Sequence, residues 1–179
     1  MRPRYIDLFR AMCGPDRIRA DSAFDAVLRD RGNALEDIDE CYVLALKPGA
    51  LDSLFKMEQV PIGPLRVDLV QLLGFSGDPR AIPLVTRALC DPDSKVREEA
   101  CEASIDLGGS DTVHGLIQRL KDLMPDVRLA AICALVDLRA SEAADQVRHR
   151  LTDMDAEVRQ AAAWALAQLE PDQSGADEV

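Results

Sequence analysis

Aromatic residues are scarce in this chain of 179 residues, which has one Trp, two Tyr and four Phe. A core with so few rings must be built mainly from Leu, Ala, Val and Ile, and this composition favours packed helices over sheets. Basic segments are also missing, since the formal net charge is −11 and none of the ranges 1–46, 47–169 and 170–179 is net positive. Nucleic acids and anionic membrane surfaces attract clustered Lys and Arg, so neither is an expected partner.

Signals for catalysis, metal binding and export are absent as well. The two histidines, His114 and His149, are too few to suggest a zinc site, and the chain has neither a Gly-rich phosphate loop nor a Gly-x-Ser-x-Gly turn. The five cysteines lack Cys-x-x-Cys spacing, which fits reduced thiols. No apolar run reaches the roughly 18 residues of a membrane span, and the first residues lack the apolar core of a secretory signal. We therefore expect a cytoplasmic protein without a catalytic site, a metal or a cofactor.

The sequence is dominated by a repeat with a period of 31 residues. Aspartate keeps this step at Asp91, Asp122 and Asp153, and Leu or Ala does so at 69, 100, 131 and 162. Periods of this length are typical of stacked supersecondary units, each of which buries its apolar face against its neighbours. The clearest column is an apolar residue followed by Arg, at Leu65-Arg66, Val96-Arg97, Val127-Arg128 and Val158-Arg159.

Each period predicts two helices. In the range 78–108, Asp78-Pro79 has the capping residue and the proline of a helix start. The turn residues 91–94 then end the first helix and cap the second, whose apolar stripe contains Val96 and Ala100. The predicted fold class is therefore all-α, a right-handed α-solenoid of stacked antiparallel helix pairs.

The chain divides into three regions according to how closely each matches the 31-residue repeat. Residues 1–46 are expected to form an N-terminal helical cap and a degenerate repeat, because an end repeat has to cover its open apolar face. Residues 47–169 hold the repeats, and residues 170–179 form an acidic tail that we expect to be disordered. Leu151 is expected inside its helix, and Cys90 is expected within a helix as a small apolar residue.

The string from Leu89 to Ala100 resembles the bacterial HEAT-like repeat of the phycobilisome-lyase type. It has an acidic turn, then Val-Arg, then an Ala-rich helix, and the ranges 122–131 and 153–162 match it too. The resemblance implies the solenoid fold, but it leaves the activity open, because this repeat type serves lyase subunits, hydroxylases, DNA glycosylase relatives and adaptors. The repeated His-Glu dipeptides of the di-iron hydroxylases do not occur in this chain.

The resemblance also implies a structural role for the regular spacing of charge. In HEAT-like repeats such residues form an Asp–Arg ladder between adjacent turns, where the planar guanidinium bridges carboxylates or carbonyls. The alternative is an anion-binding stripe. The ladder residues are Arg66, Arg97, Arg128, Arg159, Asp91, Asp122 and Asp153.

The second helix of each pair lines the concave face in this repeat type, which predicts the residues that meet a partner. Helical spacing places an acidic centre there, including Asp68, beside an apolar patch. Trp next to carboxylates is a common composition for a protein-binding face. The expected partner-binding residues are Glu98, Glu99, Glu102, Asp106, Leu129, Cys133, Asp137, Gln160 and Trp164.

We therefore favour a non-enzymatic protein-binding scaffold or adaptor that holds another protein with a basic surface. Acidic residues would steer such a partner by long-range attraction. One form of this hypothesis is an immunity-type inhibitor of a basic partner. The alternative is a lyase or chaperone subunit that acts on a phycobilin-type chromophore, and an enzyme of another type is disfavoured by the missing catalytic constellation.

Overall fold

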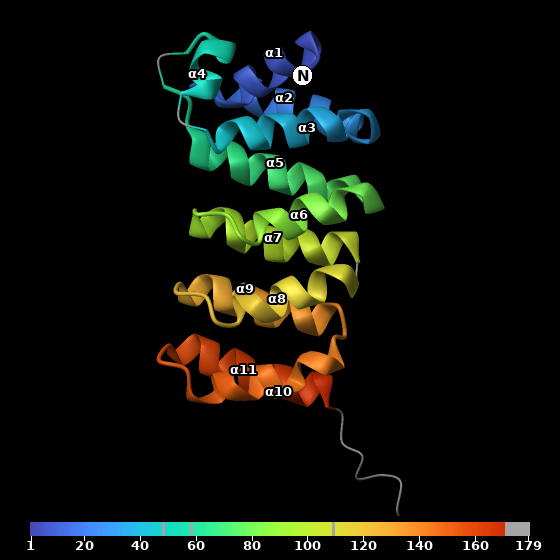
Figure 1. The fold of residues 1–179 in the computed structure, drawn as a ribbon, viewed down its shortest axis with the longest axis vertical. Helices are drawn as coiled ribbons and strands as arrows, with labels where there is room; N and C mark the ends of the chain where they lie inside the picture. The colour runs from blue at the N-terminus through green and yellow to red at the C-terminus, as the bar shows by residue number, and fades with distance from the viewer. Residues whose placement is uncertain (48, 58, 109, 171–179) are drawn as a thin grey trace, which may run out of the picture. The chain divides into compact units, whose positions relative to one another are not determined.

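The computed structural model describes residues 1–170 of the chain, apart from 48, 58 and 109. All regular elements within these residues are helical, and no strand occurs among them (Figure 1). The predicted all-α repeat fold is confirmed. The tail that we expect to be disordered lies, from residue 171 onwards, outside the described residues.

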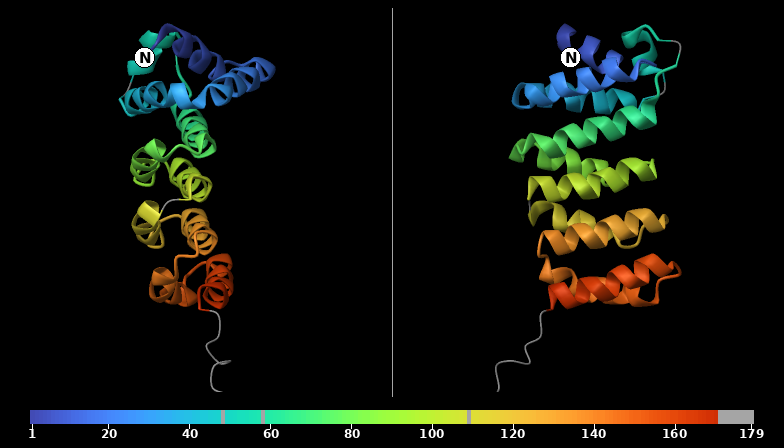
Figure 2. Two further views of the ribbon diagram at one scale, coloured as in Figure 1. Left: turned by 90° about the vertical axis from the view of Figure 1, so that its right-hand side faces the viewer. Right: turned by 180° about the vertical axis from the view of Figure 1, so that it is seen from behind.

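The chain divides into two compact units, Met1–Leu107 and Gly108–Val179, so the boundary falls inside the repeat region. In the first unit, α1 packs on α2, while α3, α5 and α7 follow one another as neighbours. Figure 2 shows that α5 and α7 belong to one row of helices, and that α6 belongs to a second row and packs against α7. The helices of this unit are α1 (Pro3–Met12), α2 (Arg17–Arg29), α3 (Arg31–Ala45), α4 (Ala50–Phe55), α5 (Ile62–Ser76), the 3₁₀ turn η1 (Pro79–Ala81), α6 (Ile82–Ala88) and α7 (Ser94–Leu107).

The second unit repeats this plan. Its longer helices α9 and α11 pack on each other, α8 packs on α9, and α10 packs on α11. The first helix of each pair is shorter than the sequence suggests, because part of it is 3₁₀ rather than α. The elements are η2 (Ser110–Thr112), α8 (Val113–Arg119), α9 (Pro125–Asp137), η3 (Ser141–Ala143), α10 (Ala144–Arg148), η4 (His149–Thr152) and α11 (Ala156–Leu169).

Part-buried polar contacts, which the sequence does not predict, join the start of α1 to α3. The backbone N–H of Arg2 donates to the Asp37 carboxylate at 2.6 Å, and Arg2 Nε donates to the same group at 2.8 Å. Asp37 is only 3% exposed, so its charge needs these donors. Tyr5 Oη donates to Asp30 at 2.7 Å and adds a second link between α1 and the start of α3.

The second helices end in a left-handed residue that follows the 31-residue period. Gly77 and Gly108 have φ values of 61° and 63°, which glycine adopts without a steric penalty. Arg139 occupies the same place after α9 with a φ of 54°. A side chain in this region costs roughly 1 kcal/mol, so the last turn of α9 is strained relative to its counterparts.

Two expectations about burial are wrong. Leu151 is 40% exposed, because it lies in η4 rather than on the buried side of an α-helix. Cys90 is exposed and follows the end of α6, so it is not a small core residue. Both residues stand in the short connecting turns, where the helical period no longer decides which side chains face inward.

The α5–α7 contact gives a test of the packing. A Cβ on Gly74 would lie 2.9 Å from both the Cα and the Cβ of Ala103. Gly74→Ala should therefore lower the free energy of unfolding by about 1–3 kcal/mol despite the better helix propensity of alanine. Urea unfolding followed by circular dichroism measures this change.

Gly32 provides the matched control, because it is also helical and a Cβ added there would meet no neighbouring atom of the described residues within 4 Å. Gly32→Ala should leave the stability unchanged or raise it by about 0.5 kcal/mol. Equal effects of the two substitutions would contradict the close approach of α5 and α7.

Candidate functional site

Asp91 is the buried centre of a polar contact in the first unit. Its side chain is fully buried and accepts two parallel hydrogen bonds from Arg66, from Nε and Nη2, each at 3.1 Å. Tyr42 Oη and the backbone N–H of Asp93 also donate to this carboxylate. Because four donors surround the charge, its loss of hydration is compensated. Burial, followed by the bond to Asp91, raises the pKa of Tyr42.

The second unit contains the same contact. Arg128 Nε and Nη2 donate to the Asp153 carboxylate at 3.0 and 2.6 Å, and the backbone N–H of Asp155 donates at 3.0 Å. Burial acts to raise the pKa of Asp153, but the bonds from Arg128 and Asp155 outweigh it and hold that pKa below its ordinary value. Both pairs join residues 25 positions apart, so each ties one second helix to the turn that precedes the next.

The acidic surface of the first unit is formed by α5 and α7. Glu98, Glu102 and Asp106 follow one another at four-residue spacing on α7. Glu98 is less exposed than the spacing predicts, with 28% of its side chain accessible, because it forms an ion pair with Lys95 at 2.7 Å. We define the acidic surface as Asp68, Glu98, Glu99, Glu102 and Asp106.

Glu99 shows how strongly these carboxylates act on one another. Burial, and then the charges of Glu102, Asp68, Asp106 and Glu98, raise the pKa of Glu99 to about 7. Burial and the charge of a further acid also raise the pKa of Asp68. The fold therefore holds like charges together at a free-energy cost, which makes this surface an attractive site for positive charge.

The N-terminal cap extends this surface in a way that sequence reasoning missed. A cavity of about 300 Å³ between α1, α2 and α5 is lined by Asp21, Asp25 and Asp68, together with the apolar side chains of Met12 and Phe24. Asp21 is the acid that acts on Asp68. The cap does not keep the period, so only its three-dimensional packing reveals that α2 adds carboxylates to those of α5.

The apolar residues expected beside the acids belong to the second unit. Leu129 and Cys133 are half-buried on α9, where Asp137 is exposed. Gln160 is exposed on α11, and Trp164 is 49% exposed on the same helix. Because α9 and α11 pack on each other, these residues lie on neighbouring helices.

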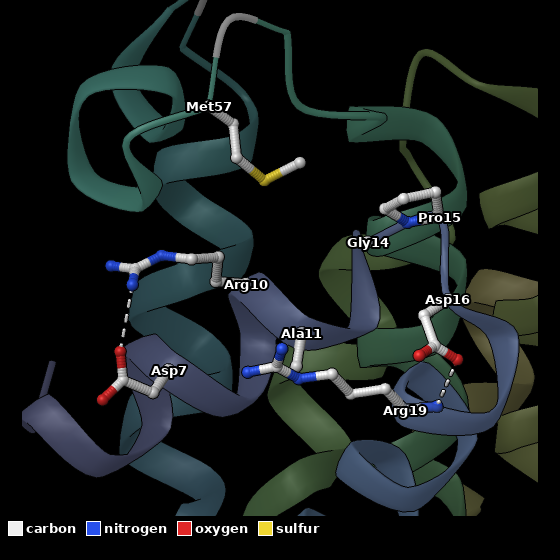
Figure 3. Close-up of a pocket in the computed structure, with 8 residues that line it drawn as sticks. All are labelled: Asp7, Arg10, Ala11, Gly14, Pro15, Asp16, Arg19 and Met57. Carbon is white, nitrogen blue, oxygen red and sulfur yellow. Dashed lines mark hydrogen bonds and ion pairs between the residues drawn. The ribbon is translucent and has the colours of Figure 1, made fainter.

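A larger cavity of about 680 Å³ opens beside α1 (Figure 3). Arg10 and Arg19 both line it, and Arg10 Nε is buried without a hydrogen-bond partner among the described residues. Arg10 Nη1 contacts Asp7 at 3.1 Å, while Asp16 accepts the backbone N–H of Arg19. The cavity combines two guanidinium groups with two carboxylates and an apolar wall. Its lining is completed by Ala11, Gly14, Pro15 and Met57.

The described residues contain no group of three or more side chains suited to hold a metal ion. Both histidines are exposed, His114 on α8 and His149 in η4. No helix in the described part of the chain combines the length and apolar character needed to cross a membrane.

Comparison with known proteins identifies the repeats. Residues 63–122 and 113–178 match the family of HEAT repeats. The fold is similar to the complex of CpcE and CpcF of phycocyanin lyase from Nostoc sp. PCC7120, with 23% identity and a TM-score of 0.63 over 92% of this chain. This chain spans 64% of that protein's chain.

An engineered protein has a similar fold at 17% identity and a TM-score of 0.53, covering 94% of this chain and 80% of its own. Likenesses at these identities concern the fold alone. No curated protein matches the sequence.

The Arg–Asp contacts predict a difference between two arginines of the same column. Arg128 is 11% exposed and pairs with Asp153, so Arg128→Ala leaves a buried carboxylate with fewer donors. The free energy of unfolding should fall by about 1–3 kcal/mol. Arg159 makes no carboxylate contact among the described residues, so Arg159→Ala should cost less than about 1 kcal/mol. Chemical denaturation of both variants tests this, and equal losses would contradict a stabilising role for the carboxylate pair.

Glu99 predicts a pH dependence. Its pKa in the folded chain is about 7 against an ordinary 4.5, so the folded state binds the proton more tightly and gains stability as the pH falls through this window. Glu99→Gln should raise the free energy of unfolding at pH 8 by about 1 kcal/mol, a figure kept small because the group is partly screened by water. The advantage over the natural chain should shrink toward pH 5. Glu157→Gln, at an exposed position of the second unit, is the control, and a gap for Glu99→Gln that is constant with pH would contradict the coupling.

Proposed function

Because this chain belongs to the HEAT-repeat family, we propose that it is a non-enzymatic scaffold whose acidic surface binds a protein with a basic surface. The observation that carries the proposal is the gathering of Asp68, Glu102 and Asp106 around Glu99, where burial and then the neighbouring charges raise the pKa of Glu99 to about 7. A partner with Lys and Arg would relieve this repulsion on binding, and relief of repulsion adds to the attraction between the two proteins.

Charge also determines how the complex would form. With a net charge of −11, the chain attracts a cationic protein at long range and speeds the encounter. The attraction is screened beyond roughly 10 Å at 0.1 M salt, so the association rate should fall as salt is added. The half-buried apolar residues Leu129 and Cys133 and the exposed Trp164 would supply apolar contact if the partner reaches the second unit.

A narrower form of the proposal is an immunity-type inhibitor, a small acidic protein that covers a basic one. The composition supports this form, since the chain has 32 Asp and Glu residues but only 21 Lys and Arg residues. Such a protein acts by occupying a surface, which requires no catalytic residues.

The second candidate is a lyase or chaperone subunit for a phycobilin-type chromophore. Its support is the cavity beside α1, where Arg10 and Arg19 lie beside apolar side chains and would pair with the carboxylates of a bilin, although Asp7 and Asp16 also line the cavity. The protein of similar fold is named as a phycocyanin lyase complex. One measurement distinguishes the two candidates. The absorption spectrum of a bilin should shift on addition of the protein only if this cavity binds the bilin, and Arg19→Ala should abolish that shift.

Charge reversal on the acidic surface tests the leading proposal. Glu98→Lys combined with Glu102→Lys should abolish capture of the partner from a lysate of the source cells, with the captured protein identified by mass spectrometry. Each substitution should change the stability by less than about 0.5 kcal/mol, because neither side chain is buried.

The matched control carries the same change of charge elsewhere. Glu142→Lys with Glu157→Lys alters two exposed acids of the second unit and should leave capture intact. Loss of binding in both double variants would indicate a general effect of net charge, and retention in both would exclude the acidic surface as the interface.

A further inference from the structure

Three arginines of the repeat column hold the turn that precedes their own helix in the same way. Arg97 Nη1 donates to the carbonyls of Asp91 and Pro92, at 2.8 and 3.1 Å. Arg128 Nη1 makes the equivalent bonds at 2.9 and 3.2 Å, and Arg159 Nη1 contacts the carbonyls of Asp153 and Met154 at 2.8 and 3.0 Å. These bonds fix the plane of each guanidinium group before any carboxylate is added.

The opposite edge of the guanidinium group distinguishes Arg159 from Arg128. Arg128 uses Nε and Nη2 to grip the carboxylate of Asp153. In Arg159 the same two nitrogens meet no acceptor within the described residues, and the side chain is exposed. Arg159 therefore presents Nε and Nη2 as a pair of hydrogen-bond donors, the same two nitrogens with which Arg128 binds the carboxylate of Asp153 in the same unit.

The surface next to Arg159 corresponds in the repeat to a face that packs against a neighbouring helix elsewhere in the chain. At successive steps of 31 residues, Val70 of α5, Cys101 of α7 and Ile132 of α9 are all buried, whereas the equivalent Ala163 of α11 is exposed. Ala167, one turn further along α11, is also exposed. Small side chains allow another helix to approach closely, as the contact between Gly74 and Ala103 illustrates in the first unit.

We propose that this face of α11, with Arg159, Ala163 and Ala167, docks a second helical-repeat protein whose inter-helix turn supplies an aspartate to Arg159. A turn aspartate suits the donor because its own backbone pre-orients the carboxylate, as the N–H of Asp155 does for Asp153. A second copy of this chain is a poor donor, since Asp91, Asp122 and Asp153 already contact Arg66, Arg119 and Arg128. The site is separate from the acidic surface and does not depend on it.

The proposal is tested first by extending the chain. A copy of residues 140–170 joined after Glu170 in place of the tail sets the copied aspartate 25 positions after Arg159, the interval that separates Arg128 from Asp153. The extended protein should gain the helicity of one repeat. Arg159→Ala should destabilise it more than it destabilises the natural chain, and replacing the copied aspartate by Asn should add little to that loss. An extension that stays unfolded, or losses that simply add, would overturn the proposed face.

The natural partner is tested by capture with the full chain. Wild type should retain a helical-repeat protein from the source lysate, and Arg159→Glu should weaken that complex at least tenfold. Arg17→Glu, at an exposed position of α2, should have no effect. Arg159→Asp should regain binding when the partner's turn aspartate is changed to Arg.

Other occupants give results that contradict the proposal. Self-association of the wild type that Arg159→Glu abolishes would identify a second copy as the occupant. If deletion of residues 171–179 is required for Arg159→Glu to change capture, the chain's own tail is the occupant. Capture that ignores Arg159→Glu, or that yields no helical-repeat protein, excludes the interface. Because Glu98→Lys with Glu102→Lys leaves Arg159 intact, failure of one surface is distinguishable from failure of the other.

Discussion

The fold depends on one recurring interaction. An arginine in the second helix of one repeat forms a hydrogen-bonded ion pair with an aspartate in the turn that precedes the second helix of the following repeat. Such a turn has to place a negative charge in a desolvated position, and it does so because the guanidinium group and the turn's own backbone provide the missing hydrogen bonds. At Asp91 the donors come from Arg66, Tyr42 and Asp93. The contact sets where each turn lies, and the turn sets where the following helix begins.

The acidic surface takes its form from that placement. Because α5 and α7 pack closely enough for Gly74 to approach Ala103, the charge of Asp68 on one helix adds to the effects of burial and of Glu102 in raising the pKa of Glu99 on the other. The packing that stabilises the unit therefore also keeps these carboxylates close together, although their repulsion contributes nothing to the stability of the unit. Such conflicts between local electrostatics and global packing are typical of functional surfaces.

Local signals explain why much of this architecture is readable from the sequence. Asp78-Pro79, Pro125 and Asp155 mark helix starts within a residue or two, since caps act over a single turn. Two Arg–Asp pairs from these columns, Arg66 with Asp91 and Arg128 with Asp153, meet in the structure at the same interval of 25 residues, because a strict period carries a contact from one repeat to another.

What the sequence hides lies where the period fails. Tyr42 donates to Asp91 from a helix that does not keep the repeat, and Asp21 joins the acids of α5 through the packing of the cap. Arg139 takes a left-handed conformation at a position that glycine fills elsewhere, which no propensity would suggest. These features arise from tertiary contacts between dissimilar segments. No repeat spacing in the sequence indicates which residues of those segments meet.

The nearest-neighbour packing of α3, α5 and α7 has a consequence for how the protein is made. Contacts between segments close in sequence close short loops, which favours rapid folding. Every residue of the acidic surface lies before residue 107, where the first unit ends. During synthesis, which presents the N-terminal part first, every residue that forms this surface is therefore on the nascent chain before translation of the second unit is complete.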